Sequence, residues 1–347
     1  MPPLKRLSLA VSSMLFRAAI ACLCASLSAS GFAWTVNSRE LVDVQFSVDD
    51  SLIILVSSPN AIEPGIYYWQ RDSAAPTLLC RLASPTAFSF DRKTIIERVA
   101  GAAPELRLYA PSNGRLLDRI KIEGDVLDAD VHGKLIAVAL RLPDTGNQLR
   151  IYGERAKRAN NGRVLARAVI GRNVEMGFTP DGRSVVNFDL SDTGAAAWSA
   201  STLASVKLPA WMAEGETTFV PGSTFVKRYV NDSLSVARWP SGTSVFRMAA
   251  ARTVRLRQLS ATGRYGALHS FDATNASATP DQALDWVDFA SHKRTRLAVG
   301  SIDNAAINAA GNRVAWVLRS SEQPDLVTVQ MVQINADGKV EATDAAR

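Results

Sequence analysis

The chain has 347 residues, of which 47% are hydrophobic and 21% charged, and its 39 Lys and Arg against 33 Asp and Glu give a formal net charge of +6. The first 33 residues hold three of the bases and none of the acids, so the rest of the chain is close to neutral. This near balance argues against nucleic acid as a partner. Cys22 and Cys24 lie in that first segment, which leaves Cys80 without a second cysteine for an internal disulfide. We therefore expect a domain that is held together by its apolar core.

Residues 1–33 predict a secretory signal peptide. Three basic residues precede a short apolar run at 18–27, and Ala29 and Ala33 each end a stretch of small residues that signal peptidase accepts. The apolar run is much shorter than the roughly 20 residues of a membrane-spanning helix. We therefore expect export to the periplasm, with cleavage after Ala29 or after Ala33. The residues before Cys22 loosely resemble a lipobox, so a lipoprotein anchored at Cys22 is the alternative.

From residue 34 to 347 the chain is a succession of short β-type runs separated by turn residues, which favours an all-β fold. One pattern, an apolar residue followed by a polar turn, recurs seven times. Its copies are Phe46-Ser-Val-Asp-Asp, Phe88-Ser-Phe-Asp-Arg, Ala129-Asp-Val-His-Gly, Phe178-Thr-Pro-Asp-Gly, Phe219-Val-Pro-Gly-Ser, Leu259-Ser-Ala-Thr-Gly and Ile307-Asn-Ala-Ala-Gly. The copies are 42, 41, 49, 41, 40 and 48 residues apart. This period predicts a single domain, a seven-bladed β-propeller of four-stranded antiparallel blades.

The first hairpin of each repeat is the most specific local prediction. Phe178 should end an innermost strand, and Asp181-Gly182 should supply the positive φ of a tight turn. We expect a looser turn at Asp91-Arg92-Lys93, where the Asp-Gly pair is missing. The repeated aromatics are expected to pack between blades. Two segments, 34–37 and 338–342, compete for the outer strand that closes the ring.

These repeats resemble those of bacterial periplasmic propellers, among them the Tol-system propeller and relatives of the amine-dehydrogenase heavy chain. The residues that carry the resemblance are the FTPDG, FSFDR and FSVDD turns. The aromatic near the end of each third strand is similar to the tryptophan of WD repeats, although the aspartate that follows it there is absent here. The resemblance implies the fold and assigns no functional residue.

Catalytic and metal-binding motifs are not found in the sequence. There is no G-x-S-x-G, Walker loop, C-x-x-C or H-E-x-x-H. Asp128 and Asp130 begin like a calcium loop, but Ala139 stands where a bidentate glutamate is needed. The histidines, His132, His269 and His292, fall in different elements, and none has a partner at a recognisable metal-ligand or triad spacing. We therefore assign no catalytic residue, metal or cofactor. We expect a monomeric, non-catalytic protein-protein interaction module or scaffold. The alternative is a propeller enzyme of dehydrogenase or lactonase type with an axial active site.

Loop charges suggest where a protein partner in the periplasm would bind. Alternating strands put the second-to-third loops, which are mostly acidic, on one face and the third-to-fourth hairpins, which are mostly basic, on the other. The acidic face is expected to dock a basic partner surface, and the basic face to meet anionic groups such as lipid heads, in a peripheral association with the envelope. The candidate residues are Glu63, Asp144, Asp192, Asp232 and Asp272 on the acidic face, and Arg155, Lys157, Arg158, Lys293, Arg294 and Arg296 on the basic face.

Overall fold

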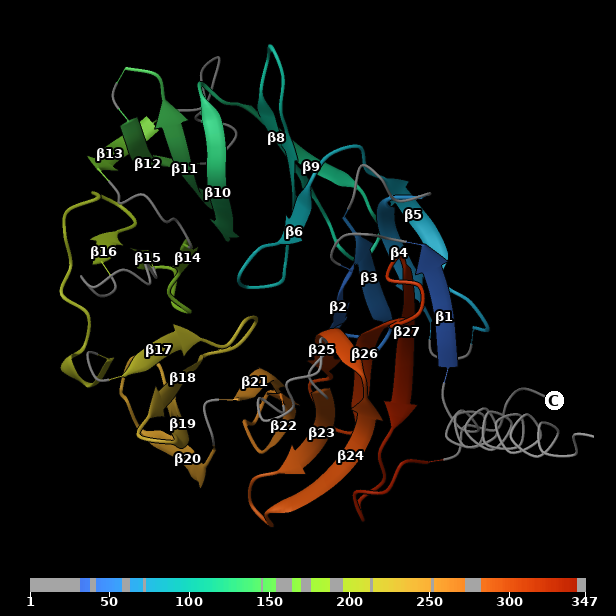
Figure 1. Ribbon diagram of the computed structural model, residues 1–347. Coiled ribbons are helices and arrows are strands. Elements are labelled where there is room, and N and C mark those ends of the chain that lie inside the picture. The colour runs from blue at the N-terminus through green and yellow to red at the C-terminus, as the bar shows by residue number, and fades with distance from the viewer. Residues whose placement is uncertain are drawn as a thin grey trace, which may run out of the picture.

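A computed structural model describes residues 32–37, 42–57, 63–70, 73–144, 146–153, 164–169, 176–187, 196–212, 215–250, 253–271 and 282–341. The chain forms a β-propeller of seven antiparallel blades arranged around a central axis (Figure 1). Each blade is a separate sheet, and consecutive sheets follow one another around the ring in sequence order, with the first strand of each blade innermost. The predicted fold class is confirmed.

The strands of the seven blades have the following bounds. The first blade holds β2 (Val42–Phe46), β3 (Leu52–Val56), β4 (Gly65–Trp69) and β5 (Thr77–Arg81), and the second β6 (Thr86–Phe88), β7 (Ile95–Val99), β8 (Glu105–Tyr109) and β9 (Leu116–Lys121). The third holds β10 (Asp125–His132), β11 (Leu135–Leu142), β12 (Gly146–Tyr152) and β13 (Val164–Val169), and the fourth β14 (Met176–Phe178), β15 (Ser184–Asn187) and β16 (Ala196–Ser199). The fifth holds β17 (Glu216–Phe219), β18 (Phe225–Val230), β19 (Ser233–Arg238) and β20 (Ser244–Ala249), and the sixth β21 (Val254–Leu259), β22 (Tyr265–Phe271), β23 (Gln282–Asp288) and β24 (Lys293–Val299). The seventh holds β25 (Ser301–Ile307), β26 (Arg313–Arg319), β27 (Leu326–Gln333) and β1 (Phe32–Asn37).

The fourth blade completes its outer edge without a regular strand. After β16 the chain turns back, and Trp198 and Ser205 form an isolated antiparallel bridge. The Val206 amide also donates to the Ala197 carbonyl at 2.9 Å. The segment after the turn thus occupies the place of a fourth strand. The one helix of the described residues is a short 3-10 turn, Ala210–Met212, and no helix among them is long and apolar enough to cross a membrane.

The ring is closed by the N-terminal strand. β1 pairs antiparallel with β27, from Phe32 opposite Met331 to Asn37 opposite Leu326, and so forms the outermost strand of the seventh blade. Of the two candidates for this place, the segment at 34–37 holds it. The competing C-terminal segment forms only an isolated bridge between Ile334 and Val340.

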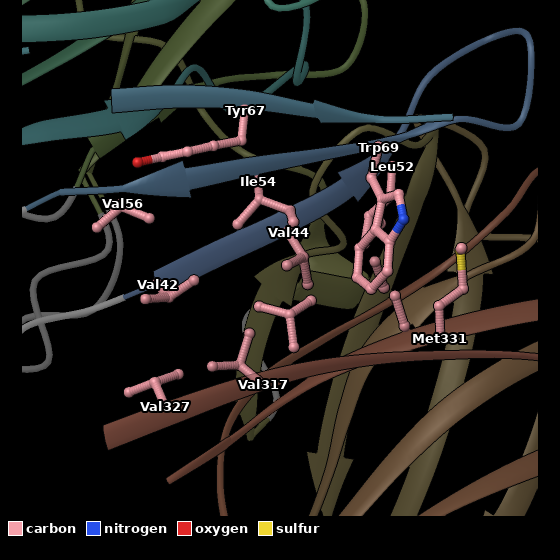
Figure 2. Close-up of a cluster of buried hydrophobic side chains, with 13 residues drawn as sticks. Val42, Val44, Leu52, Ile54, Val56, Tyr67, Trp69, Val317, Val327 and Met331 are labelled. Carbon is pink, nitrogen blue, oxygen red and sulfur yellow. The ribbon is translucent and has the colours of Figure 1, made fainter. Parts of the chain in front are cut away.

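Apolar side chains fill the spaces between blades. In the cluster between the first and seventh blades, Leu52, Ile54 and Trp69 face Val317 and Met331 (Figure 2). Six blades have the predicted aromatic at or near the end of the third strand, as where Trp69 lies opposite Leu52, and the seventh has Val332 there. Phe178 and Phe219 are both 1% exposed, which confirms that these repeated aromatics belong to the core.

Candidate functional site

The first hairpins of the first, second and fourth blades are each held by a Ser or Thr and an Asp two residues later. In the fourth blade, Thr179 Oγ1 donates to Asp181 Oδ1 at 2.6 Å and accepts from the Ser184 amide at 3.0 Å. The Gly182 amide donates to the Thr179 carbonyl at 2.7 Å, and the φ of Gly182 is +68°. These contacts explain the recurring turn pattern, because each polar side chain satisfies backbone groups that the tight turn leaves unpaired.

The same turns build a cavity of about 910 Å³ where the axis opens on the face of the first-to-second hairpins. Six of the turns contribute an apolar residue to its lining, always two positions after the repeat anchor: Val48, Phe90, Pro180, Pro221, Ala261 and Ala309. We call this cavity the axial mouth and these six residues its apolar ring. In the third blade β10 runs on to a two-residue turn, and His132 takes the equivalent place. The mouth is thus lined by one turn from every blade.

Phe90 is the member of the ring that reaches furthest. Its amide donates to Asp130 Oδ1 of the third blade at 2.7 Å, and its carbonyl accepts from the Gly222 amide of the fifth blade at 2.8 Å. Its ring lies edge-on to that of Phe219 with centroids 5.8 Å apart. A Cβ added at Gly177 of the fourth blade would come within 3.3 Å of the Phe90 ring. Because the second and fifth blades are not neighbours in the ring, this turn spans the axis.

Asp130 anchors that turn. Its Oδ1 accepts from the Phe90 and Val131 amides, and its Oδ2 accepts from the Phe178 amide at 2.7 Å, so one carboxyl joins the second, third and fourth blades. Asp130 is 2% exposed, and burial raises its pKa to about 7 although the three amides act in the opposite direction. The acidic pair that begins like a calcium loop is therefore engaged with backbone amides, since Asp128 likewise accepts from the Met176 amide at 3.0 Å.

The turn at Asp91-Arg92-Lys93 differs from its sequence prediction. We expected a looser turn, but the Arg92 amide donates to the Ser89 carbonyl at 2.9 Å, as in the Asp-Gly turns, and Arg92 has φ = +62°. A left-handed backbone is unfavourable for an arginine. Here tertiary contacts hold it: Arg92 Nη1 lies 2.8 Å from Asp43 Oδ2, its guanidinium lies 5.0 Å from the centre of the Phe88 ring, and its carbonyl accepts from Gln45 Nε2 at 2.9 Å.

The predicted acidic docking residues fall in second-to-third loops where the structure describes them. Glu63 precedes β4, Asp144 separates β11 from β12, and Asp232 separates β18 from β19. These loops lie on the face away from the axial mouth, because antiparallel strands alternate in direction. Glu63 pairs with Arg81 at the end of β5 at 3.0 Å, an ion pair that the sequence could not indicate. Asp192 and Asp272 lie outside the described residues.

The predicted basic residues are placed differently from the expectation. Lys293, Arg294 and Arg296 lie in the outer strand β24 and not in the hairpin before it. Arg294 and Arg296 both bind the carboxylate of Asp285, which is 1% exposed and lies on the neighbouring strand. The reason is register, since β24 runs alongside β23 and brings both guanidinium groups to one carboxylate. Arg155, Lys157 and Arg158 lie outside the described residues.

The histidines do not come together. His269 is fully buried, its Nδ1 accepts from Arg257 Nη2 at 2.6 Å, and its Nε2 lies 2.9 Å from Gln282 Oε1. Burial, with Arg257 second, lowers the pKa of His269 to about 4, so the imidazole is neutral at pH 7. His132 Nδ1 lies 3.9 Å from Asp91 Oδ2, and His292 is exposed on the hairpin before β24. Within the described residues, no group of three or more His, Cys, Asp or Glu could hold a metal ion.

Comparison with known proteins identifies the fold and no family. No protein-family model matches the sequence, and no curated protein matches it. The resemblance to bacterial periplasmic propellers therefore stays a prediction. Among 782 solved chains that are similar to this one is a chain of the structure titled "Crystal Structure of Mitotic Checkpoint Complex". It superimposes with a TM-score of 0.51 at 10% sequence identity, covering 87% of this chain and 94% of that chain. A likeness at this identity supports the β-propeller and says nothing about its activity.

Proposed function

We propose that this protein is a non-catalytic interaction module that docks a protein partner at the axial mouth. The observation that carries the proposal is the apolar ring. Turn residues on a protein surface are usually polar, yet six turns place an apolar side chain around one cavity, and Val48 among them is fully exposed. Exposed apolar groups gathered around a concave surface are typical of binding sites. A closed seven-bladed ring supplies a rigid frame for such a site.

The enzyme alternative finds less support at the same place. A hydrolytic or metal-dependent axial site needs a nucleophile with its base, or a set of metal ligands, at bonding distances. In the mouth, His132 approaches Asp91 at 3.9 Å, beyond a hydrogen bond, and the described residues supply no metal-binding group. Two further acidic side chains near the mouth, Asp128 and Asp130, accept backbone amides.

Export to the periplasm is part of the proposal and rests on the N-terminal sequence. The position of β1 favours one of the two cleavage sites. Cleavage after Ala33 would remove Phe32 and Ala33, which pair with Met331 and Gln330, whereas cleavage after Ala29 keeps the whole closing strand. N-terminal sequencing of the mature protein should therefore begin at Ser30. An acylated Cys22 at the N-terminus would support the lipoprotein alternative, and an intact Met1 would contradict export.

Site-specific photocross-linking tests the docking surface. A benzoylphenylalanine is introduced at Val48, in the mouth, or at Val299, which is 59% exposed on the outer strand β24 and serves as the matched control. In the cell that naturally makes the protein, ultraviolet light should join the Val48 variant to a defined protein, and the Val299 variant should give no such adduct. Absence of an adduct at Val48, or equal adducts at both positions, would contradict docking at the mouth.

A further inference from the structure

Two carboxylates, those of Asp49 and Asp91, line the polar part of the axial mouth. Asp49, in the first turn of the first blade, accepts from the Ser47 and Tyr68 hydroxyls, and these two hydrogen bonds lower its pKa. Its carboxylate is therefore ionised at neutral pH. No lysine, arginine or histidine within the described residues forms an ion pair with it. An exposed, fixed negative charge thus lies beside the apolar ring.

Asp91 adds a second carboxylate from the next blade. Its Oδ1 accepts from the Ser89 hydroxyl at 2.7 Å and from the Lys93 amide at 3.0 Å. Its Oδ2 lies 3.9 Å from His132 Nδ1, and no lysine or arginine of the described residues forms an ion pair with it. Both carboxylates are positioned by the turn that carries them, so neither has to be ordered when a ligand binds.

Neither the arginine nor the lysine among the described lining residues forms an ion pair with Asp49 or Asp91. Arg92 lines the mouth, but its guanidinium is paired with Asp43 at 2.8 Å. Lys93 is exposed and is the one remaining lysine or arginine among the described lining residues. Gln45 adds a third acceptor: it is 5% exposed, its Nε2 donates to the Arg92 carbonyl, and its Oε1 has no hydrogen-bond partner among the described residues. The wall formed by the first two blades therefore favours a ligand that donates hydrogen bonds and carries positive charge.

The opposite wall carries most of the apolar ring, beside the uncharged polar side chains of Thr179, Ser223, Thr224 and Gln258. Phe90 and the turns of the fourth to seventh blades contribute Pro180, Pro221, Ala261 and Ala309. A group that fits both walls has an apolar stem and a cationic head. Lysine and arginine side chains have this form, since they bury their methylene groups against apolar surface while the charged end stays with polar partners. An acidic group would be repelled by the two carboxylates. A wholly apolar group would remove the carboxylates from water and offer them no hydrogen-bond partner.

We infer that the axial mouth binds a lysine or arginine side chain of the partner, its stem against Phe90, Pro180 and Pro221 and its charged head at Asp49 and Asp91. The inference rests on the proposed function and names the chemistry that the docked segment must present. The acids of the first-to-second turns surround the axis, whereas the third-to-fourth hairpins lie at the periphery. The face that we expected to be basic therefore has an acidic centre.

The test uses three synthetic peptides, acetylated and amidated, with Gly-Leu-Gly on each side of a central arginine, norleucine or glutamate. Binding to the full-length mature protein is measured up to millimolar concentration at low salt. The arginine peptide should bind about two- to thirtyfold more tightly than the norleucine peptide, as two exposed ion pairs allow, and the glutamate peptide more weakly than either. Free arginine amide, measured in parallel, should bind more weakly than the peptide if the flanking apolar residues contribute.

Variants separate the inference from the proposed function. Asp49→Asn combined with Asp91→Asn keeps an acceptor oxygen in each turn and should abolish the preference for arginine over norleucine, whereas Lys93→Ala should increase it. Equal binding of the arginine and norleucine peptides, a preference that survives the double variant, or no binding of the arginine peptide would overturn the inference. If cross-links from Val48 still form in that case, docking at the mouth stands and only its charge preference fails.

Discussion

Closure of the ring by β1 gives a prediction that can be worked out from the structure. Trp34 points into the cluster between the seventh and first blades, and its ring lies 4.9 Å from that of Tyr67. Replacing a fully buried tryptophan by alanine costs about 3 to 5 kcal/mol. Trp34 is half-buried, so we expect about half of this loss of unfolding free energy. Loss of the aromatic contact with Tyr67 adds about 1 kcal/mol. Trp34→Ala should therefore lower the free energy of unfolding by about 3 kcal/mol.

The matched control lies on the other face of the same strand. Thr35 is exposed, and its hydroxyl shares one surface hydrogen bond of 3.2 Å with that of Thr328. Thr35→Ala should change the free energy of unfolding by no more than about 0.5 kcal/mol. Urea denaturation followed by far-ultraviolet circular dichroism measures both variants. A loss below about 1 kcal/mol for Trp34→Ala, or an equal loss for Thr35→Ala, would refute closure by β1.

Further predictions concern the core, the turns and the buried carboxyl. Phe178→Ala should lower the free energy of unfolding by about 3 to 5 kcal/mol, and an unchanged melting temperature would show that Phe178 is not core. Gly182→Ala should lower the melting temperature more than Gly133→Ala does. Both glycines have positive φ, but an added Cβ would come 2.2 Å from His132 at Gly182 and would meet nothing within 4 Å at Gly133. Equal losses of melting temperature would contradict this packing. The pKa of Asp130 is about 7 in the fold against 3.8 for the free group, so the folded state binds the extra proton between these values and loses stability as pH rises through them. Urea titrations should show wild type weakening relative to Asp130→Asn from pH 4 to 7, by at most about 1.4 kcal/mol per pH unit, and a relative gain would contradict the shift.

Local patterns predicted the fold well because a propeller repeats one local unit. Thr179, Asp181 and Gly182 satisfy the backbone of their own turn, so the hairpin could be recognised without knowing the rest of the chain. Ring closure was different. The segments at 34–37 and 338–342 both have β-type sequences, and the choice between them depends on which one reaches the edge of β27.

The candidate site was harder to predict, since it depends on contacts between blades. The sequence indicated Phe88 as a core anchor but gave no reason for Phe90 to reach Gly222, three blades further on. Arg92 was expected to loosen its turn, because nothing in the local sequence shows that Asp43 would hold it. One signal was present and could have been used: the position two residues after the anchor is apolar in all seven repeats.

The most direct test of the account compares the two faces of the disc in one binding measurement. The partner identified by cross-linking is titrated against wild type, against Asp49→Asn with Asp91→Asn at the mouth, and against Asp144→Asn with Asp232→Asn on the opposite face. Asparagine tolerates the left-handed backbone of Asp232, φ = +56°, so both double variants should keep the fold. We expect the mouth variant to bind the partner more weakly, with a reduced salt dependence, and the opposite-face variant to bind like wild type. Weakened binding of the opposite-face variant alone would contradict this expectation and place the docking surface on the second-to-third loops.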